Sequence, residues 1–110
     1  MRKRLPKNAD PEMVEWFAPY TYSEARRKLS RYVAPTLAKE RKRRGIRKDE
    51  AVRLHRLGRG ALALWEDETC ESLPPLHTTR SLLLTYRASF QTIRDTVALY
   101  NAFIVAHGSL

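Results

Sequence analysis

The stretch LLTYRASFQTIRDTVALYNAFI, residues 83–104, has the most regular apolar pattern in this chain of 110 residues. Its apolar side chains recur in steps of three and four, a spacing that places them on one face of an α-helix. These side chains are Leu83, Tyr86, Phe90, Ile93, Val97, Tyr100 and Ile104. The pattern predicts one long C-terminal helix with a single apolar stripe, and Gly108 is placed to end it.

A second long helix is predicted in the first half of the chain. Thr21 is followed three residues later by Glu24, which is the spacing of a capping box at a helix start. Pro35 stops or bends this helix, because proline has no N–H for the helical hydrogen bond. Residues 36–44 can continue it to Gly45, a suitable residue for a C-terminal cap.

The segment between these two regions, IRKDEAVRLHRLGRGALALWEDE at 46–68, also has a helical apolar face. Gly58 and Gly60 lower helix propensity, and we expect them to allow close packing of a neighbouring helix or a bend. The acidic residues that begin at Glu66 oppose the dipole at a helix C-terminus, so the helix is predicted to end near them.

Proline marks two further boundaries. Asp10-Pro11 predicts the start of a short helix that Pro19 ends, and Pro74-Pro75 predicts a break before the C-terminal segment. No segment has the two-residue alternation of a strand together with hairpin turn signals. We therefore expect an all-α protein, a small single-domain bundle of about four to five helices with a long C-terminal helix.

The length favours a single helical domain over residues 1–110. Within it we distinguish a basic arm at 1–9 that can be flexible, a basic helical half at 10–48, and core helices at 49–110. The net charge of +9 belongs to the first half of the chain. Residues 1–59 hold 18 Lys and Arg against 7 Asp and Glu, whereas residues 60–110 hold 3 against 5. Such an imbalance indicates a partner of negative charge.

The densest positive charge lies in KERKRRGIRKDE at 39–50, where seven Lys and Arg occupy ten residues. Like charges three or four residues apart destabilise an isolated helix, whereas a phosphate backbone would neutralise them and release counterions. We expect this segment and the basic helix before it, which begins its run of cations at Arg26, to bind nucleic acid. The candidate contact residues are Arg26, Arg27, Arg31, Lys39, Arg41, Lys42, Arg43, Arg44, Arg47 and Lys48.

Two further groups of cations could enlarge this surface. Arg53, Arg56 and Arg59 recur every third residue, and the N-terminal segment adds Arg2, Lys3, Arg4 and Lys7. Arg80, Arg87 and Arg94 recur every seven residues beside the apolar stripe, and their stems are expected to cover the edge of the core. Two alternatives remain for the basic segment: binding to an acidic protein surface, including the EDETCE segment (66–71) of a second copy, or solvation alone.

The sequence lacks the usual patterns of a catalytic or metal site. The three histidines are far apart, no CxxC pair or glycine-rich phosphate loop occurs, and we expect neither a metal nor another cofactor. Asp67 and Glu71 could share a helix face, but an acidic, solvent-exposed helix end explains them as well. We therefore expect that the protein is not an enzyme. The single cysteine, Cys70, favours a reducing, cytoplasmic location, and the short aliphatic runs predict no membrane segment.

The sequence thus predicts a non-catalytic protein that contacts the phosphate backbone of DNA or RNA with little base specificity. We expect it to act as a small subunit of a larger nucleoprotein assembly, with other protein subunits or self-association. The alternative is a protein-interaction, scaffolding or regulatory module. Its basic half would bind an acidic protein, and its C-terminal helix would self-associate.

Overall fold

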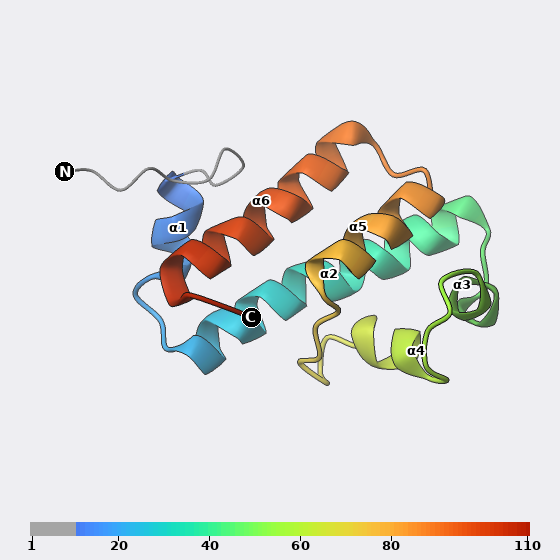
Figure 1. Cartoon of the computed structure of the whole chain (residues 1–110), viewed down its shortest axis with the longest axis horizontal. Coiled ribbons are helices and arrows are strands. Elements are labelled where there is room, and N and C mark those ends of the chain that lie inside the picture. Colours follow the sequence, from blue (N-terminus) through green and yellow to red (C-terminus); the bar gives the residue numbers. More distant parts are fainter. Residues whose placement is uncertain (1–10) are drawn as a thin grey trace.

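The computed structural model describes residues 11–110, which form six α-helices and no strand (Figure 1). The helices are α1 (Pro11–Phe17), α2 (Tyr22–Arg44), α3 (Lys48–Leu54), α4 (Ala61–Trp65), α5 (Leu76–Thr85) and α6 (Phe90–His107). The all-α class is therefore confirmed, with six helices rather than four or five. The C-terminal helix is long at 18 residues, although α2 is longer at 23. The predicted basic arm at 1–9 lies outside the described residues.

Three helices form the body of the molecule. α2, α5 and α6 pack on one another, and α6 runs antiparallel to the other two (Figure 1). α1 packs on α6 at one end of the molecule. α3 and α4 pack on each other at the opposite end, where α4 also contacts α2. None of the helices in the described part of the chain is both long enough and apolar enough to cross a lipid bilayer.

The limits of α2 follow from its predicted caps. Thr21 Oγ1 accepts a hydrogen bond from the backbone N–H of Glu24 at 3.2 Å, and Gly45 ends the helix with φ of 77°. This left-handed conformation suits glycine, which has no Cβ. Pro35, however, does not stop the helix. Proline removes the hydrogen bond to the carbonyl of Arg31, and both residues are exposed, so water can replace the lost donor.

The segment at 46–68 differs from its predicted continuous face. α3 ends at Leu54 and α4 begins at Ala61, and between them Arg56 and Gly60 both have positive φ. A methyl group on Gly58 or Gly60 would have no atom within 4 Å, so neither glycine serves close helix packing. The two glycines instead lie in the turn that separates the helices. The helix end near the acidic residues is confirmed, because α4 ends at Trp65.

The C-terminal stripe is also divided. α5 ends at Thr85 and α6 begins at Phe90, so residues 83–104 form parts of two antiparallel helices rather than one helix. The turn contains Arg87 with φ of 53°, and Ser89 Oγ caps α6 by accepting from the N–H of Thr92 at 3.1 Å. The reversal lets the α5 part of the stripe pack against α6, which a single helix would not allow.

The core draws side chains from both halves of the sequence. It contains Leu29, Val33 and Leu37 of the basic helix α2, together with Leu82 and Leu83 of α5 and Leu99, Tyr100 and Phe103 of α6. The hydroxyl of Tyr100 lies 2.9 Å from both Thr79 Oγ1 and the carbonyl oxygen of Pro74, so this buried polar group is satisfied. Burial raises the pKa of Tyr100 above its ordinary range. The side chains of residues 11–48 thus help to hold the fold together as well as carrying charge.

The N-terminal aromatic residues attach α1 to the bundle. The ring of Phe17 is buried and meets Phe103 edge to face, with 5.6 Å between the ring centroids. Lys28 Nζ lies 4.2 Å from the ring centre of Trp16 and 4.1 Å from that of Tyr20, in cation–π geometry. Lys28 therefore acts within the fold, although it belongs to the basic sequence of α2.

Candidate nucleic-acid interface

The ten predicted contact residues do not form one surface. Eight of them lie on α2, Arg47 precedes α3, and Lys48 is the first residue of α3. Because a helix turns by roughly 100° per residue, consecutive cations on α2 point in different directions. Some face solvent, some bind carboxylates of this chain, and one is buried.

Arg41 is the buried member of the set. Its Nε and Nη2 atoms bind Glu66 Oε2 and Oε1 at 2.8 and 2.9 Å, and its Nη1 donates to the carbonyl oxygen of Ile46 at 2.8 Å. The side chains of Arg41 and Glu66 are only 8% and 4% exposed. The hydrogen bonds with Glu66 raise the pKa of Arg41 further above its ordinary value. Arg41 therefore cannot reach a phosphate backbone without breaking an internal ion pair, and we remove it from the candidate surface.

Three other predicted residues have carboxylate partners but remain partly open to solvent. Arg43 Nη2 binds Glu40 at 3.0 Å and donates to the carbonyl oxygen of Arg87 at 2.9 Å. Arg47 Nε lies 3.2 Å from Glu50, and Arg27 Nε lies 2.6 Å from Glu71. These guanidinium groups could bind a phosphate only in addition to a carboxylate, or after releasing it.

Arg26 has a different surrounding. It is half-buried, and its Nη1 atom is enclosed without a hydrogen-bond partner. Burial raises the pKa of Tyr100, and the nearby positive charge of Arg26 offsets a smaller part of that rise. Arg26 thus faces the interior side of α2 rather than the outer side.

The remaining five cations form the exposed set. Arg31, Lys39 and Lys42 lie within roughly 80° of arc on the solvent side of α2. Arg44 ends the helix, and Lys48 follows at the start of α3. All five are exposed, and none has a carboxylate of residues 11–110 within 4.0 Å of its charged nitrogen atoms. We call Arg31, Lys39, Lys42, Arg44 and Lys48 the open cation set.

An acidic turn lies beside part of this set. Lys42 and Lys48 line a shallow hollow together with Asp67 and Glu68. Asp67 accepts hydrogen bonds from the side chain and backbone of Thr69 and from Cys70, which lower its pKa, and Lys48 lowers it further. Asp67 is thus held in its ionised form, and it offsets some of the local positive charge.

The neighbouring turn between α3 and α4 adds further cations. Arg56 and Arg59 are exposed there, and Arg59 shares a second hollow with Lys48 and Arg53. Arg53 lies 3.8 Å from Asp49, whereas Arg56 and Arg59 have no ion-pair partner in the described part of the chain. The three-residue spacing predicted one helix for Arg53, Arg56 and Arg59, but only Arg53 lies on a helix, because α3 ends at Leu54. The predicted contribution of Arg2, Lys3, Arg4 and Lys7 falls outside the described residues.

Two carboxylates of the acidic segment that could have bound a second copy are paired within their own chain. Glu66 binds Arg41 and Glu71 binds Arg27. In residues 11–110, no group of three or more His, Cys, Asp or Glu side chains is arranged to hold a metal ion. The sequence matches no protein-family model, no curated protein and no solved structure.

Proposed function

We propose that this chain is a non-catalytic nucleic-acid-binding protein that contacts the phosphate backbone through the open cation set. The observation that carries the proposal is the excess charge left after internal pairing. Residues 39–60 hold ten Lys and Arg against three Asp and Glu. Even with the acidic turn beside them, Lys39, Arg44, Arg56 and Arg59 stay exposed and without an ion pair in the described structure.

The arrangement favours phosphate contact over base recognition. Lys39 and Lys42 lie about one turn apart on a straight helix face, so both can follow one strand of a nucleic acid. Lysine ammonium groups bind phosphate as point charges and do not distinguish one base edge from another. We therefore expect DNA and RNA of different sequences to bind with similar affinity, as suits a small subunit of a larger nucleoprotein assembly.

Salt dependence is the first test of this proposal. The purified chain is titrated against fluorescein-labelled random-sequence duplex DNA and single-stranded RNA while fluorescence anisotropy is recorded. For about four phosphate contacts, log affinity should fall against log salt concentration with a slope of about −3.6 on duplex DNA. An absence of binding, or an affinity that does not change with salt, would contradict the proposal.

A charge-matched pair of variants tests where the nucleic acid binds. Lys39→Glu with Lys42→Glu should weaken binding at least about tenfold and make the salt slope less steep by about 2. Arg80→Glu with Arg94→Glu changes the net charge by the same amount on α5 and α6, and should leave most of the affinity. Equal losses in both variants would show that net charge rather than the open cation set determines binding. Arg41 is unsuitable for this test, because a glutamate there would face Glu66 and disturb the fold.

A further inference from the structure

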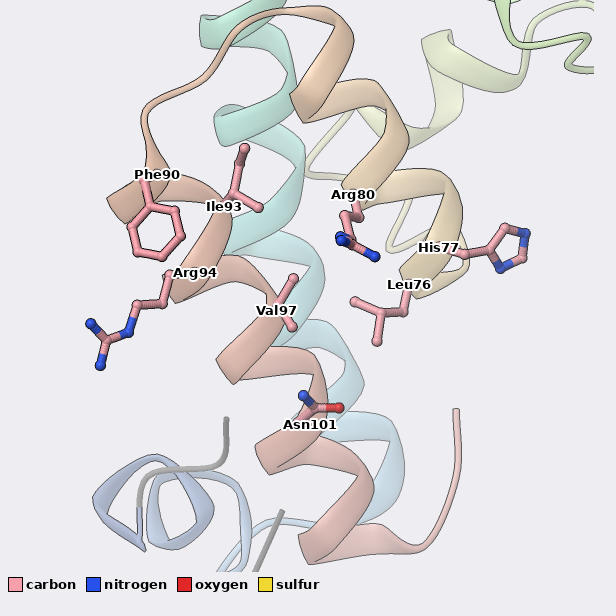
Figure 2. Close-up of a pocket in the computed structure, with 8 residues that line it drawn as sticks. All are labelled: Leu76, His77, Arg80, Phe90, Ile93, Arg94, Val97 and Asn101. Carbon is pink, nitrogen blue, oxygen red and sulfur yellow. The ribbon is translucent and has the colours of Figure 1, made fainter. Parts of the chain in front are cut away.

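A groove between α5 and α6 is lined by four apolar and four polar or charged side chains (Figure 2). Its volume is about 730 Å³. Leu76 of α5 faces Val97 of α6, Ile93 lies one turn further along α6, and Phe90 lies at one end. In Figure 2, α2 passes behind α6 and the groove opens on the viewer's side of the two helices.

The groove exists because α6 has apolar side chains on two faces. Leu99 and Phe103 are buried in the core, whereas Ile93 and Val97 are only half-buried. Phe90 is 79% exposed. An aromatic ring beside two branched aliphatic side chains is a surface that gains free energy when a partner excludes water from it.

The charge around the groove is positive. Arg80 of α5 and Arg94 of α6 line it and are exposed. No carboxylate of residues 11–110 lies within 4.0 Å of either guanidinium group. The acidic neighbour of Arg94 in sequence, Asp95, accepts a hydrogen bond from Gln91 Nε2 at 2.8 Å and does not line the groove.

We propose that this groove binds an amphipathic helix of another protein that carries acidic residues beside its apolar face. The α6 wall from Phe90 to Asn101 extends for roughly 16 Å, which matches about three turns of a bound helix. Apolar residues spaced by three and four along that helix would cover Leu76, Ile93 and Val97. Its Asp or Glu side chains would bind Arg80 and Arg94 through charge-assisted hydrogen bonds.

The positive charge of the groove argues against two occupants from this protein itself, which are a second copy and residues 1–10. A symmetric contact between two copies would bring two pairs of Arg80 and Arg94 together in a desolvated interface, where like charges repel strongly. Residues 1–10 hold four Lys and Arg against one Asp, so they have the same sign as the groove. The fitting partner is therefore a different, acidic chain. This inference does not depend on the proposed nucleic-acid binding.

Two labelled peptides serve as probes. Each has about fifteen residues with leucines spaced by three and four, and the remaining positions carry glutamate in one peptide and lysine in the other. Fluorescence anisotropy is measured against the chain of 110 residues. The glutamate peptide should bind at least about tenfold more tightly than the lysine peptide, because only it can pair with the groove arginines.

Three variants locate the site. Arg80→Glu with Arg94→Glu should reverse the preference, so that the lysine peptide binds more tightly. Phe90→Ala should weaken the binding of the glutamate peptide at least about tenfold. It should not lower thermal stability, because the Phe90 ring is exposed. Lys39→Glu with Lys42→Glu should leave peptide affinity unchanged, although it weakens nucleic-acid binding.

Several results would overturn the inference. They are no binding of the glutamate peptide, equal affinity for both peptides, and an unchanged preference in the Arg80→Glu, Arg94→Glu variant. If sedimentation shows a dimer that Phe90→Ala converts to a monomer, the groove belongs to a second copy. If Phe90→Ala weakens the binding of RNA and not that of the peptide, the groove is a nucleic-acid site.

Discussion

The C-terminal end of α2 and the groove between α5 and α6 both carry arginine, but the two regions differ in what surrounds it. At the end of α2, Arg41 and Arg43 bind carboxylates of the same chain. In the groove, Arg80 and Arg94 have no such partner in residues 11–110. The comparison teaches that the density of cations in a sequence does not measure the charge that a ligand meets.

The ion pair of Arg41 and Glu66 explains why this difference matters for stability. Taking both charges out of water is costly, and their attraction and hydrogen bonds offset that cost. Removing one partner leaves the other buried without compensation. The exposed groove arginines have no such constraint, so changing them should affect binding rather than folding.

The largest expected effect is therefore at Glu66. Glu66→Ala should lower the free energy of unfolding by about 3–5 kcal/mol, because it leaves the buried guanidinium of Arg41 without its carboxylate. Urea unfolding followed by circular dichroism measures this change. Glu68→Ala is the control, since Glu68 is exposed and should stay within about 0.5 kcal/mol of the parent. A loss below about 1 kcal/mol at Glu66 would mean that the pair is not buried as described.

The two apolar faces of α6 give the next largest contrast. Phe103→Ala should cost about 3 kcal/mol, because it leaves a cavity beside Phe17. Phe90→Ala should change the free energy of unfolding by less than about 0.5 kcal/mol. Urea midpoints of the two variants give the comparison directly. Similar losses at both positions would place Phe90 in the core and remove the groove.

The smallest effect concerns the acidic turn beside the open cation set. Hydrogen bonding to Asp67 raises the pKa of the Cys70 thiol, so less thiolate is present at a given pH. Asp67→Asn removes the negative charge, and alkylation of Cys70 by iodoacetamide at mildly alkaline pH should become about two- to threefold faster. Glu68→Gln should leave the rate unchanged. If Asp67→Asn has no effect, the turn does not hold its described geometry.

Several features of the fold could be predicted because their signals are local. Thr21 caps α2 and Gly45 ends it, as their residue types and neighbours indicate. The turn between α5 and α6 could not be predicted in this way. Tyr86 and Phe90 keep the helical spacing across it, and the turn contains neither glycine nor proline. Its left-handed residue is Arg87, which a propensity argument does not favour in that conformation.

The candidate site shows the same limit. The pairing of Glu40 with Arg43 and of Asp49 with Arg53 has the spacing of helical ion pairs, and the sequence alone could have indicated both. The burial of Arg41 depends on Glu66, which is 25 residues away and meets it only in the folded chain. The density of cations in the sequence therefore overestimated the positive surface at Arg41. Arg80 and Arg94 of the groove were expected only to cover the edge of the core.

The ion pair that spans those 25 residues also has a consequence for local unfolding. α3 and α4 lie between Arg41 and Glu66 in the sequence and pack on each other, and α4 also packs on α2. The Arg41–Glu66 pair therefore joins the end of this pair of short helices to the C-terminal part of α2. When it opens, the backbone amides of both short helices should lose their protection against hydrogen exchange together, while the three-helix body stays closed.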